Sequence, residues 1–338
     1  MMQLSGATKI VAAALASAAL GLAAFAQAPE QKKAAVGKDA LAQINAALQN
    51  GEADRALALL HSLAQSGVEV AEARNLECRV LYMLDQWNRA ADECEQAVNL
   101  DRENSRYHLW LGRALGEKAD RASFLSAYSL AKRVRAEFEE AVRLDPLDGE
   151  ALSDLGEFYY SAPGAVGGGI DKAEKVAVQL EKVDATRAHE LRGHIAEERK
   201  DYVTAEREFK QSIAVSAHPA SQWMTLAGFY LHRERWTEMV SAVENGASLA
   251  QRDRKASVAL YDGAALLTRT NRNPERAAKM LEDYLASPAK TEAAPSFQAR
   301  LRLARLEEQL GDSGAAQRER AAALALAHDY TPPQDAKH

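Results

Sequence analysis

The sequence has few of the features that mark a disulfide-rich domain, a β-sheet protein or a nucleic-acid-binding protein. Only two cysteines and 6% aromatic residues occur among 338 residues, which excludes a dense disulfide framework. Glycine and proline cluster at a few points instead of recurring every few residues, and this argues against an all-β fold. The formal net charge of −6 comes from interspersed charges of both signs. Nothing in the composition therefore indicates nucleic acid as a partner.

Catalytic and cofactor motifs are also missing. The sequence contains no nucleophile elbow, no plausible Cys–His pair and no dinucleotide fingerprint. In the stretch His189–His194 the two histidines stand five residues apart, whereas a zinc helix needs four, and the extra residue turns the second ring about 100° away. The glycine-rich segment 164–169 lacks the Gly-Lys-Ser/Thr ending of a phosphate loop. We expect no enzymatic activity, no catalytic residue, no metal and no cofactor.

The N-terminus has the pattern of an export signal. Lys9 is followed by an uncharged run rich in alanine and leucine over 10–26, which ends in a small-residue cleavage pattern. Pro29 disfavours cleavage at the second such pattern, so the sequence predicts a signal peptide over 1–26, cut after Ala26. An uncleaved anchor is the alternative. No other stretch is apolar enough to span a membrane. We expect a periplasmic or secreted protein with no stable membrane span after cleavage.

Helical periodicity begins at Asp39 and repeats in pairs, with a spacing near 34 residues. The second helix of each pair carries one small or medium apolar residue at the same place, where two helices cross closely. The longest separations between these positions coincide with insertions at 116–125 and 162–169. Because one pair cannot bury its apolar face alone, stacked pairs are needed for stability. The sequence predicts an all-α solenoid of about eight helix pairs, with these crossing positions: Ala56, Ala90, Val134, Ala173, Ala205, Met239, Ala277 and Ala316.

The domain organisation follows from this pattern. We expect a flexible leader over 27–38, a solenoid over 39–328 and a disordered tail over 329–338. The approximate units are 39–70, 71–104, 105–148, 149–185, 186–219, 220–253, 254–290 and 291–328.

Three stretches carry a resemblance to a known repeat. Residues 223–230 read Trp-x2-Leu-Ala-x2-Tyr, residues 155–159 read Leu-Gly-x2-Tyr, and residues 138–146 read Phe-x2-Ala-x4-Pro. With these motifs the chain resembles the tetratricopeptide repeat (TPR) family, in a form exported by bacteria. The resemblance implies a right-handed α–α superhelix that binds a protein or peptide partner on its concave face, without catalysis.

Some TPR proteins hold a C-terminal carboxylate with a Lys and Asn pair on the first helix of a unit. The matching positions in the second unit are Asn75 and Arg79, and the slot of Arg79 recurs as Arg113, Glu157 and His194 in the next three units. The pattern departs from that clamp, but two arginines on successive helices suit carboxylates. Our hypothesis is a concave face that is basic early and more acidic later. An ordinary solvated face is the alternative.

Two further features leave alternatives open. Cys78 and Cys94 lie eight residues on either side of a turn near Gln86, so antiparallel helices would place them face to face. In an oxidising compartment they form a disulfide, or they are two small core residues with free thiols.

The glycines of the fourth-unit insertion, Gly167, Gly168 and Gly169, let the loop fold back over the edge of the solenoid. A second functional hypothesis uses this loop and the insertion at 116–125, because long insertions often carry function. In that case the protein is a small-ligand binder or an enzyme accessory subunit. The sequence leaves the partner's identity and the oligomeric state open.

Overall fold

The computed structural model describes residues 37–66 and 70–330, and these residues contain helices and no strand. The signal peptide and its cleavage site lie outside the described residues. A helix over 37–49 opens the first of eight antiparallel pairs. The helices that follow are α2 (Ala53–Gln65), α3 (Ala71–Met83), α4 (Trp87–Leu100), α5 (Ser105–Asp120), α6 (Phe124–Leu144), α7 (Gly149–Ser161), α8 (Ile170–Leu180), α9 (Ala185–Glu198), α10 (Tyr202–Val215), α11 (Ala220–His232), α12 (Trp236–Arg252), α13 (Val258–Arg269), α14 (Pro274–Ala286), α15 (Ser296–Gln309) and α16 (Ser313–Leu324).

A residue with positive φ recurs in the turn between the two helices of most pairs. This left-handed conformation is rare for residues other than glycine, and it ends a helix sharply. The two pairs that contain the insertions differ: the α5–α6 turn has no such residue, and the α7–α8 loop has two, Gly167 and Gly169. The residues that turn the regular pairs are Gly51, Asp85, Lys200, Glu234, Asn271 and Gly311.

Aspartate side chains begin several helices. Asp148 accepts hydrogen bonds from the backbone N–H groups of Glu150 and Ala151 at the start of α7. Asp184, Asp201 and Asp312 do the same at α9, α10 and α16. Each cap satisfies a donor that the helix cannot pair internally.

The crossing positions predicted from the sequence are all buried, from 0% exposed at Ala56 to 5% at Val134. The first helix carries a matching small residue. A Cβ added to Gly112 would lie 2.4 Å from the ring of Phe138, and one added to Gly193 would lie 2.5 Å from the ring of Phe209. The close approach of the two helices of a pair therefore depends on these glycines.

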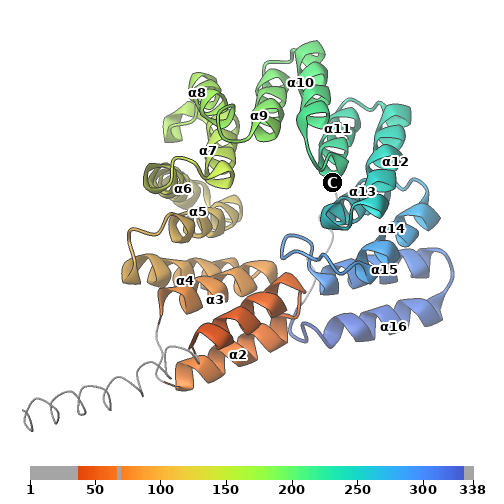
Figure 1. Ribbon diagram of the computed structural model, residues 1–338, viewed down its shortest axis with the longest axis horizontal. Helices are drawn as coiled ribbons and strands as arrows, with labels where there is room; N and C mark the ends of the chain where they lie inside the picture. Colours follow the sequence, from red (N-terminus) through yellow and green to blue (C-terminus); the bar gives the residue numbers. More distant parts are fainter. Residues whose placement is uncertain (1–36, 67–69, 331–338) are drawn as a thin grey trace, which may run out of the picture.

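The solenoid closes on itself, so that the first and last pairs lie side by side (Figure 1). One apolar cluster joins residues of the first three helices to residues of α15 and of the segment from α16 onward. Its fully or nearly fully buried members include Ile44, Leu48, Leu76, Val80, Phe297, Ala323 and Ala327. This shared core makes the molecule a ring instead of an open superhelix with two free ends.

Polar contacts follow the same seam. Asp54 accepts hydrogen bonds from the backbone N–H and the ring of His328, both at 2.9 Å. Tyr330 donates to Asp85 at 2.9 Å and packs edge-on against Phe297. The prediction of a disordered tail from 329 is therefore wrong at Tyr330, because the N-terminal pairs provide a partner that the local sequence does not show. Residues 331–338 of that tail lie outside the described residues.

Two smaller findings complete the fold. The predicted leader ends earlier than expected, because residues 37 and 38 already belong to the first helix. Among residues 37–66 and 70–330, none of the helices combines the length and the apolar character needed to cross a membrane.

Candidate functional site

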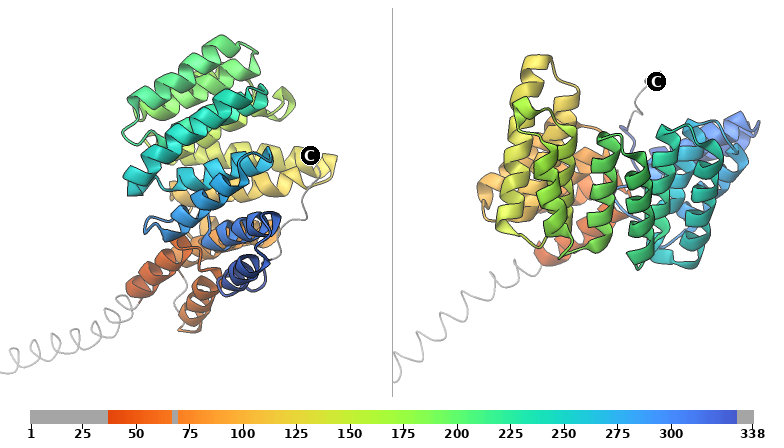
Figure 2. Two further views of the ribbon diagram at one scale, coloured as in Figure 1. Left: turned by 90° about the vertical axis from the view of Figure 1, so that its right-hand side faces the viewer. Right: turned by 90° about the horizontal axis from the view of Figure 1, so that it is seen from above.

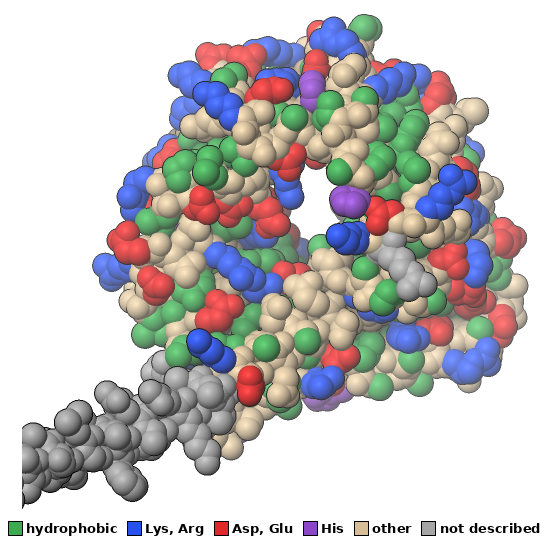
Figure 3. Space-filling view, in the orientation of Figure 1, with side chains coloured by type: hydrophobic (Ala, Val, Ile, Leu, Met, Phe, Trp, Pro, Cys, Tyr) green, Lys and Arg blue, Asp and Glu red, His purple; other side chains and the backbone are tan. Residues whose placement is uncertain are grey.

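The inner face of the ring is formed by the first helix of each pair, and the second helices lie outside (Figure 1). The space-filling view shows an opening through the centre of the ring, with acidic, basic and histidine side chains at its edge (Figure 3). Four of the five predicted partner-binding residues occupy the equivalent position of successive first helices. They are Arg79 on α3, Arg113 on α5, Glu157 on α7 and His194 on α9. This inner face is the candidate site.

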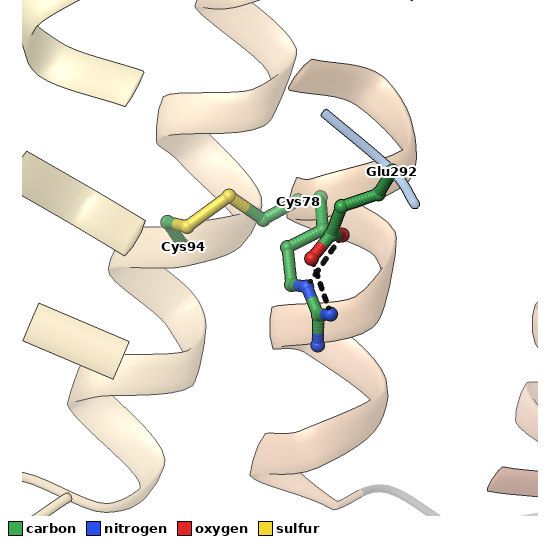
Figure 4. Close-up of a disulfide and its surroundings, with 4 residues drawn as sticks. Cys78, Cys94 and Glu292 are labelled. Carbon is green, nitrogen blue, oxygen red and sulfur yellow. Dashed lines mark hydrogen bonds and ion pairs between the residues drawn. A yellow bond between two sulfur atoms is a disulfide. The ribbon is translucent and has the colours of Figure 1, made fainter. Parts of the chain in front are cut away.

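Arg79 on α3 forms a two-point ion pair with Glu292, which lies in the segment between α14 and α15 (Figure 4). The Nε and Nη2 atoms of Arg79 donate at 3.0 and 2.7 Å. The arginine side chain is 2% exposed and that of Glu292 is 17% exposed. The predicted cationic position is therefore occupied by a carboxylate of the same chain.

Asn75 lies one turn before Arg79 on the same helix and is 0% exposed. Neither polar atom of its side-chain amide has a hydrogen-bond partner, and the same is true of Nη1 of Arg79. The prediction that Asn75 contacts a partner is not compatible with this burial.

Arg113 on α5 is also paired within the chain. Its Nε donates to Asp154 at 2.6 Å and its Nη2 donates to Glu150 at 3.3 Å. The guanidinium groups of Arg79 and Arg113 both lie over the indole of Trp110, at 5.3 and 4.8 Å from its centroid. The early part of the inner face is thus a compact stack in which carboxylates neutralise the arginines.

Glu157 and His194 follow along α7 and α9. The Glu157 side chain is exposed to the interior of the ring, yet the surrounding protein raises its pKa by desolvation, and the nearby charge of Asp154 adds to this. His194 stacks on Tyr160 with centroids 5.6 Å apart and lies 3.9 Å from Glu197. Glu157 is exposed and His194 is partly exposed, in contrast to the buried Asn75 and Arg79.

A pocket of about 400 Å³ lies beside the Arg79–Glu292 pair. Its walls come from four first helices and from the α14–α15 segment. The charged and aromatic groups that line it are Arg79, Trp110, Arg113, Glu150, Arg187 and Glu292.

A second pocket of about 410 Å³ lies between α11 and α13, lined by Ser221, Thr225, Asp262, Leu266 and Arg269 among others. Burial raises the pKa of the Asp262 carboxyl to about 6, although the positive charge of Arg302 works in the opposite direction. Among the described residues, no hydrogen bond to the Asp262 carboxylate is found. The sequence analysis did not select Asp262. It could have been found as an acidic residue that directly follows Tyr261, the helix-crossing position of the first helix of its pair.

The insertion at 162–169 packs against α6, the helix that follows the insertion at 116–125. The hydroxyl of Tyr128 donates to the carbonyl of Ala165 at 3.3 Å, and Arg135 donates to the carbonyl of Val166 at 3.4 Å. Gly167 has a φ of 103°, and a Cβ on it would lie 1.9 Å from the guanidinium of Arg135. A glycine is required there because the loop passes directly against α6.

Gly168 is constrained in a different way, since a Cβ on it would lie 1.8 Å from the carbonyl oxygen of Ala162. Gly169 has a φ of 158° and meets no neighbour within 4 Å, and its N–H donates to the carbonyl of Tyr159 at 2.7 Å. The three glycines therefore serve the packing of the loop against α6 and α7.

Cys78 and Cys94 form a disulfide between α3 and α4, with Cα atoms 5.2 Å apart (Figure 4). The bridge lies directly beside Arg79 in sequence, so it fixes the helix that carries the closing ion pair.

Within the described ranges, six of the seven histidines lie near a carboxylate. Nδ1 of His189 lies 2.8 Å from Glu208, and His232 lies 3.2 Å from Glu197. In the described part of the chain, no three or more His, Cys, Asp or Glu side chains are grouped so that they could hold a metal ion.

No protein-family model matches the chain, and no curated protein matches it either. Solved structures do. Yeast Tom70 is 16% identical, with a TM-score of 0.52 over 81% of this chain and 56% of that one. A thermophilic TPR protein of Thermus thermophilus is 16% identical, with a TM-score of 0.49 over 58% of this chain and 99% of that one. The Cut9–Hcn1 hetero-tetramer of the APC/C gives 13% identity and a TM-score of 0.40, over 86% of this chain and 53% of that one.

The class of protein follows from the fold. Paired helices, small residues at the crossings and the likeness to Tom70 make the chain an all-α, right-handed TPR superhelix. It is a helical-repeat fold whose two ends are joined into a ring.

Proposed function

We propose that this protein is a non-catalytic scaffold of the bacterial cell envelope that binds a protein or peptide partner on the inner face of its ring. The observation that carries the proposal is the pocket between α11 and α13. Asp262 there is a desolvated carboxylate for which the described residues supply no hydrogen bond, and Arg269 lies at the edge of the same pocket. A partner that brings a donor or a positive charge would relieve the cost of keeping this carboxylate charged.

Two further features support binding at the inner face. The two pockets described above are lined by first helices, and residues 291–293 of the α14–α15 segment also line one of them. Polar side chains also link successive first helices: Glu190 accepts from Gln222 at 3.2 Å, and Tyr82 donates to Glu117 at 3.3 Å. These links hold the inner face in one shape, which lowers the entropy lost on binding.

Site-specific photocrosslinking in the native envelope tests the proposal. A photoreactive residue replaces Ala265 or Arg269 on the inner face, and Val178 or Val203 on the outer helices α8 and α10 serves as the matched control. The two valines are 57% and 82% exposed, so they report contact with the outer surface. We expect a defined partner from the inner positions only. Equal recovery of the same proteins from the valine positions would contradict the proposal.

The location in the envelope is tested separately. The same cells are fractionated, and the N-terminus of the mature protein is sequenced. Recovery in the periplasm or medium with a new N-terminus after Ala26 supports export and cleavage, and recovery of the full chain in the cytoplasm contradicts both.

A further inference from the structure

The α5–α6 pair is longer than its neighbours. α5 and α6 contain 16 and 21 residues, against 13 and 14 for α3 and α4. The additional turns project beyond the adjacent pairs at one face of the ring (Figure 2). We call the projecting end, residues 115–135, the α5–α6 tip.

The tip presents apolar side chains that the fold does not use. Phe124 is 85% exposed, Leu125 is 81% exposed and Tyr128 is 41% exposed. They stand at the first turn of α6, close together on the outermost part of the tip. Exposing large apolar groups together in this way is costly in water, and such groups mark contact sites.

The tip is held in place by the second insertion. Tyr128 and Arg135 both donate to the loop that contains Gly167, and this glycine leaves the space that the Arg135 side chain needs. The fourth-unit insertion therefore supports the N-terminal half of α6, directly after the third-unit insertion. A rigid support of this kind suits an element that must hold two exposed side chains in a fixed direction.

The shape and size of the apolar group restrict what can cover it. A stable protein interface buries roughly 800 Å² on each partner, which three side chains on a convex end cannot supply. A tip-to-tip contact between two copies of the chain meets the same limit. A lipid bilayer needs no complementary pocket, and shallow insertion of a few apolar side chains gives weak, reversible binding.

The charge of the tip favours an anionic surface. Residues 115–135 contain five basic and two acidic side chains, in a chain whose net charge is −6. Arg121, Arg133 and Arg135 pair with Glu117, Glu95 and Glu139. Lys118 and Lys132 are therefore the basic groups of the tip that form no ion pair with the described residues, and they are the ones open to an anionic surface. The ammonium of Lys132 lies 4.4 Å from the centroid of the Tyr128 ring. Tyrosine with a nearby cation is typical of the boundary between acyl chains and headgroups, where basic residues attract anionic lipids.

We propose that the α5–α6 tip docks the ring onto an anionic lipid bilayer by inserting Phe124 and Leu125 below its headgroups. The inner face is not part of this contact, so the proposal stands apart from partner binding inside the ring. The opening is left free because the tip projects along the ring axis, beyond the adjacent helix pairs (Figure 2).

A local fluorescence reporter tests the insertion in the full-length chain. Phe124→Trp is compared with Leu147→Trp, since Leu147 is 73% exposed in the turn between α6 and α7, outside the tip. The probe is vesicles that contain phosphatidylglycerol with brominated acyl chains, which quench an inserted indole. We expect at least twofold stronger quenching for Phe124→Trp. Because the reporter is local, binding through another part of the chain does not produce this difference.

Two variants separate insertion from charge attraction. Phe124→Ser/Leu125→Ser, assayed in the chain with Tyr128→Trp as reporter, should abolish quenching. Lys118→Glu/Lys132→Glu should weaken it about tenfold on anionic vesicles, and this loss should shrink as salt rises. Equal quenching at positions 124 and 147 overturns the proposal. The proposal is also overturned if the Phe124→Ser/Leu125→Ser variant keeps its contact with vesicles but loses a protein that the native chain captures.

Discussion

Glu292 holds Arg79 in an ion pair across 213 residues of sequence, with bonds of 3.0 and 2.7 Å. The pair joins the segment before the last helix pair to the first helix of the second pair. It therefore helps to close the ring, and its carboxylate also neutralises the arginine that the sequence predicts as a free cation of the inner face. The same ion pair therefore joins the two ends of the chain and neutralises Arg79 on the inner face.

Replacing Glu292 should weaken the closure. The Glu292→Ala variant leaves the guanidinium of Arg79 buried without an anion, and breaking a buried pair from one side costs about 3–5 kcal/mol. Glu292 is partly accessible, so we expect the lower end, about 3 kcal/mol, in chemical denaturation. The double variant Arg79→Met/Glu292→Leu should recover most of this loss, because apolar residues replace both partners.

Glu150→Ala is the matched control for that experiment. Glu150 also pairs with an inner-face arginine, but its side chain is 55% exposed. Exposed pairs contribute less than about 1 kcal/mol. Equal losses for the two single variants would show that the Arg79–Glu292 pair does not have the role in closure described above.

The sequence predicts the local structure well, because local structure depends on spacing. The crossing positions Ala56 to Ala316 are buried as expected, and Gly51 and Gly311 mark turns with positive φ. The chain folds as the predicted all-α superhelix. These features depend on contacts within one helix pair or between neighbouring pairs, and the periodic pattern contains that information.

Ring closure could not be predicted in the same way. The curvature of a solenoid is the sum of small rotations between successive pairs, and no motif records that sum. The closure brings Glu292 to Arg79 and Tyr330 to Asp85, and neither contact is visible in the local sequence. For this reason the sequence placed the candidate residues on the correct helices but did not show which of them remain accessible.

The disulfide gives a prediction about reducing conditions. Cys78 and Cys94 are 16 residues apart, and closing a loop of that size stabilises the folded state by about 3 kcal/mol in the chain-entropy account. Adding reductant should lower the melting temperature followed by circular dichroism. The Cys78→Ala/Cys94→Ala variant should melt lower than the oxidised protein and should not respond to reductant. A melting curve of the native chain that is unchanged by reductant contradicts the prediction.

The glycine loop gives a prediction with an internal control. Gly167→Ala forces an alanine into a left-handed conformation against Arg135, and Gly168→Ala brings a methyl group onto the carbonyl of Ala162. Each should lower the free energy of unfolding by about 1–3 kcal/mol. Gly164 lies in the same loop with negative φ and open space around it. Gly164→Ala should therefore stay within about 0.5 kcal/mol of the native chain, and similar losses in all three variants would refute the geometric explanation.

Asp262 gives a prediction about pH. Its pKa is raised from 3.8 to about 6 in the folded state, so folding favours the protonated form. The contribution of Asp262 to the free energy of unfolding is fully present below about pH 4. This contribution is lost as pH rises through about 6, because the buried carboxyl must then ionise. Asp262→Asn removes that cost. The variant should match the native chain near pH 4 and exceed its free energy of unfolding by about 2 kcal/mol above pH 7.

An aspartate with the opposite shift provides the control. Asp201 accepts a hydrogen bond from the backbone N–H of Thr204 at the start of α10, and its pKa is lowered by hydrogen bonds to Thr204. Its stabilising contribution is present at neutral pH and is lost as pH falls through the lowered pKa. Asp201→Ala should therefore destabilise the chain at pH 7 and have less effect at low pH. Urea denaturation of both variants between about pH 2 and about pH 8 measures the two slopes, which must differ in sign: the Asp201 slope lies below about pH 4, and the Asp262 slope lies between about pH 4 and about pH 6. If Asp262→Asn destabilises the chain at pH 7, the carboxylate has a favourable partner in the fold, and the inner pocket between α11 and α13 has no unmet need for a cation.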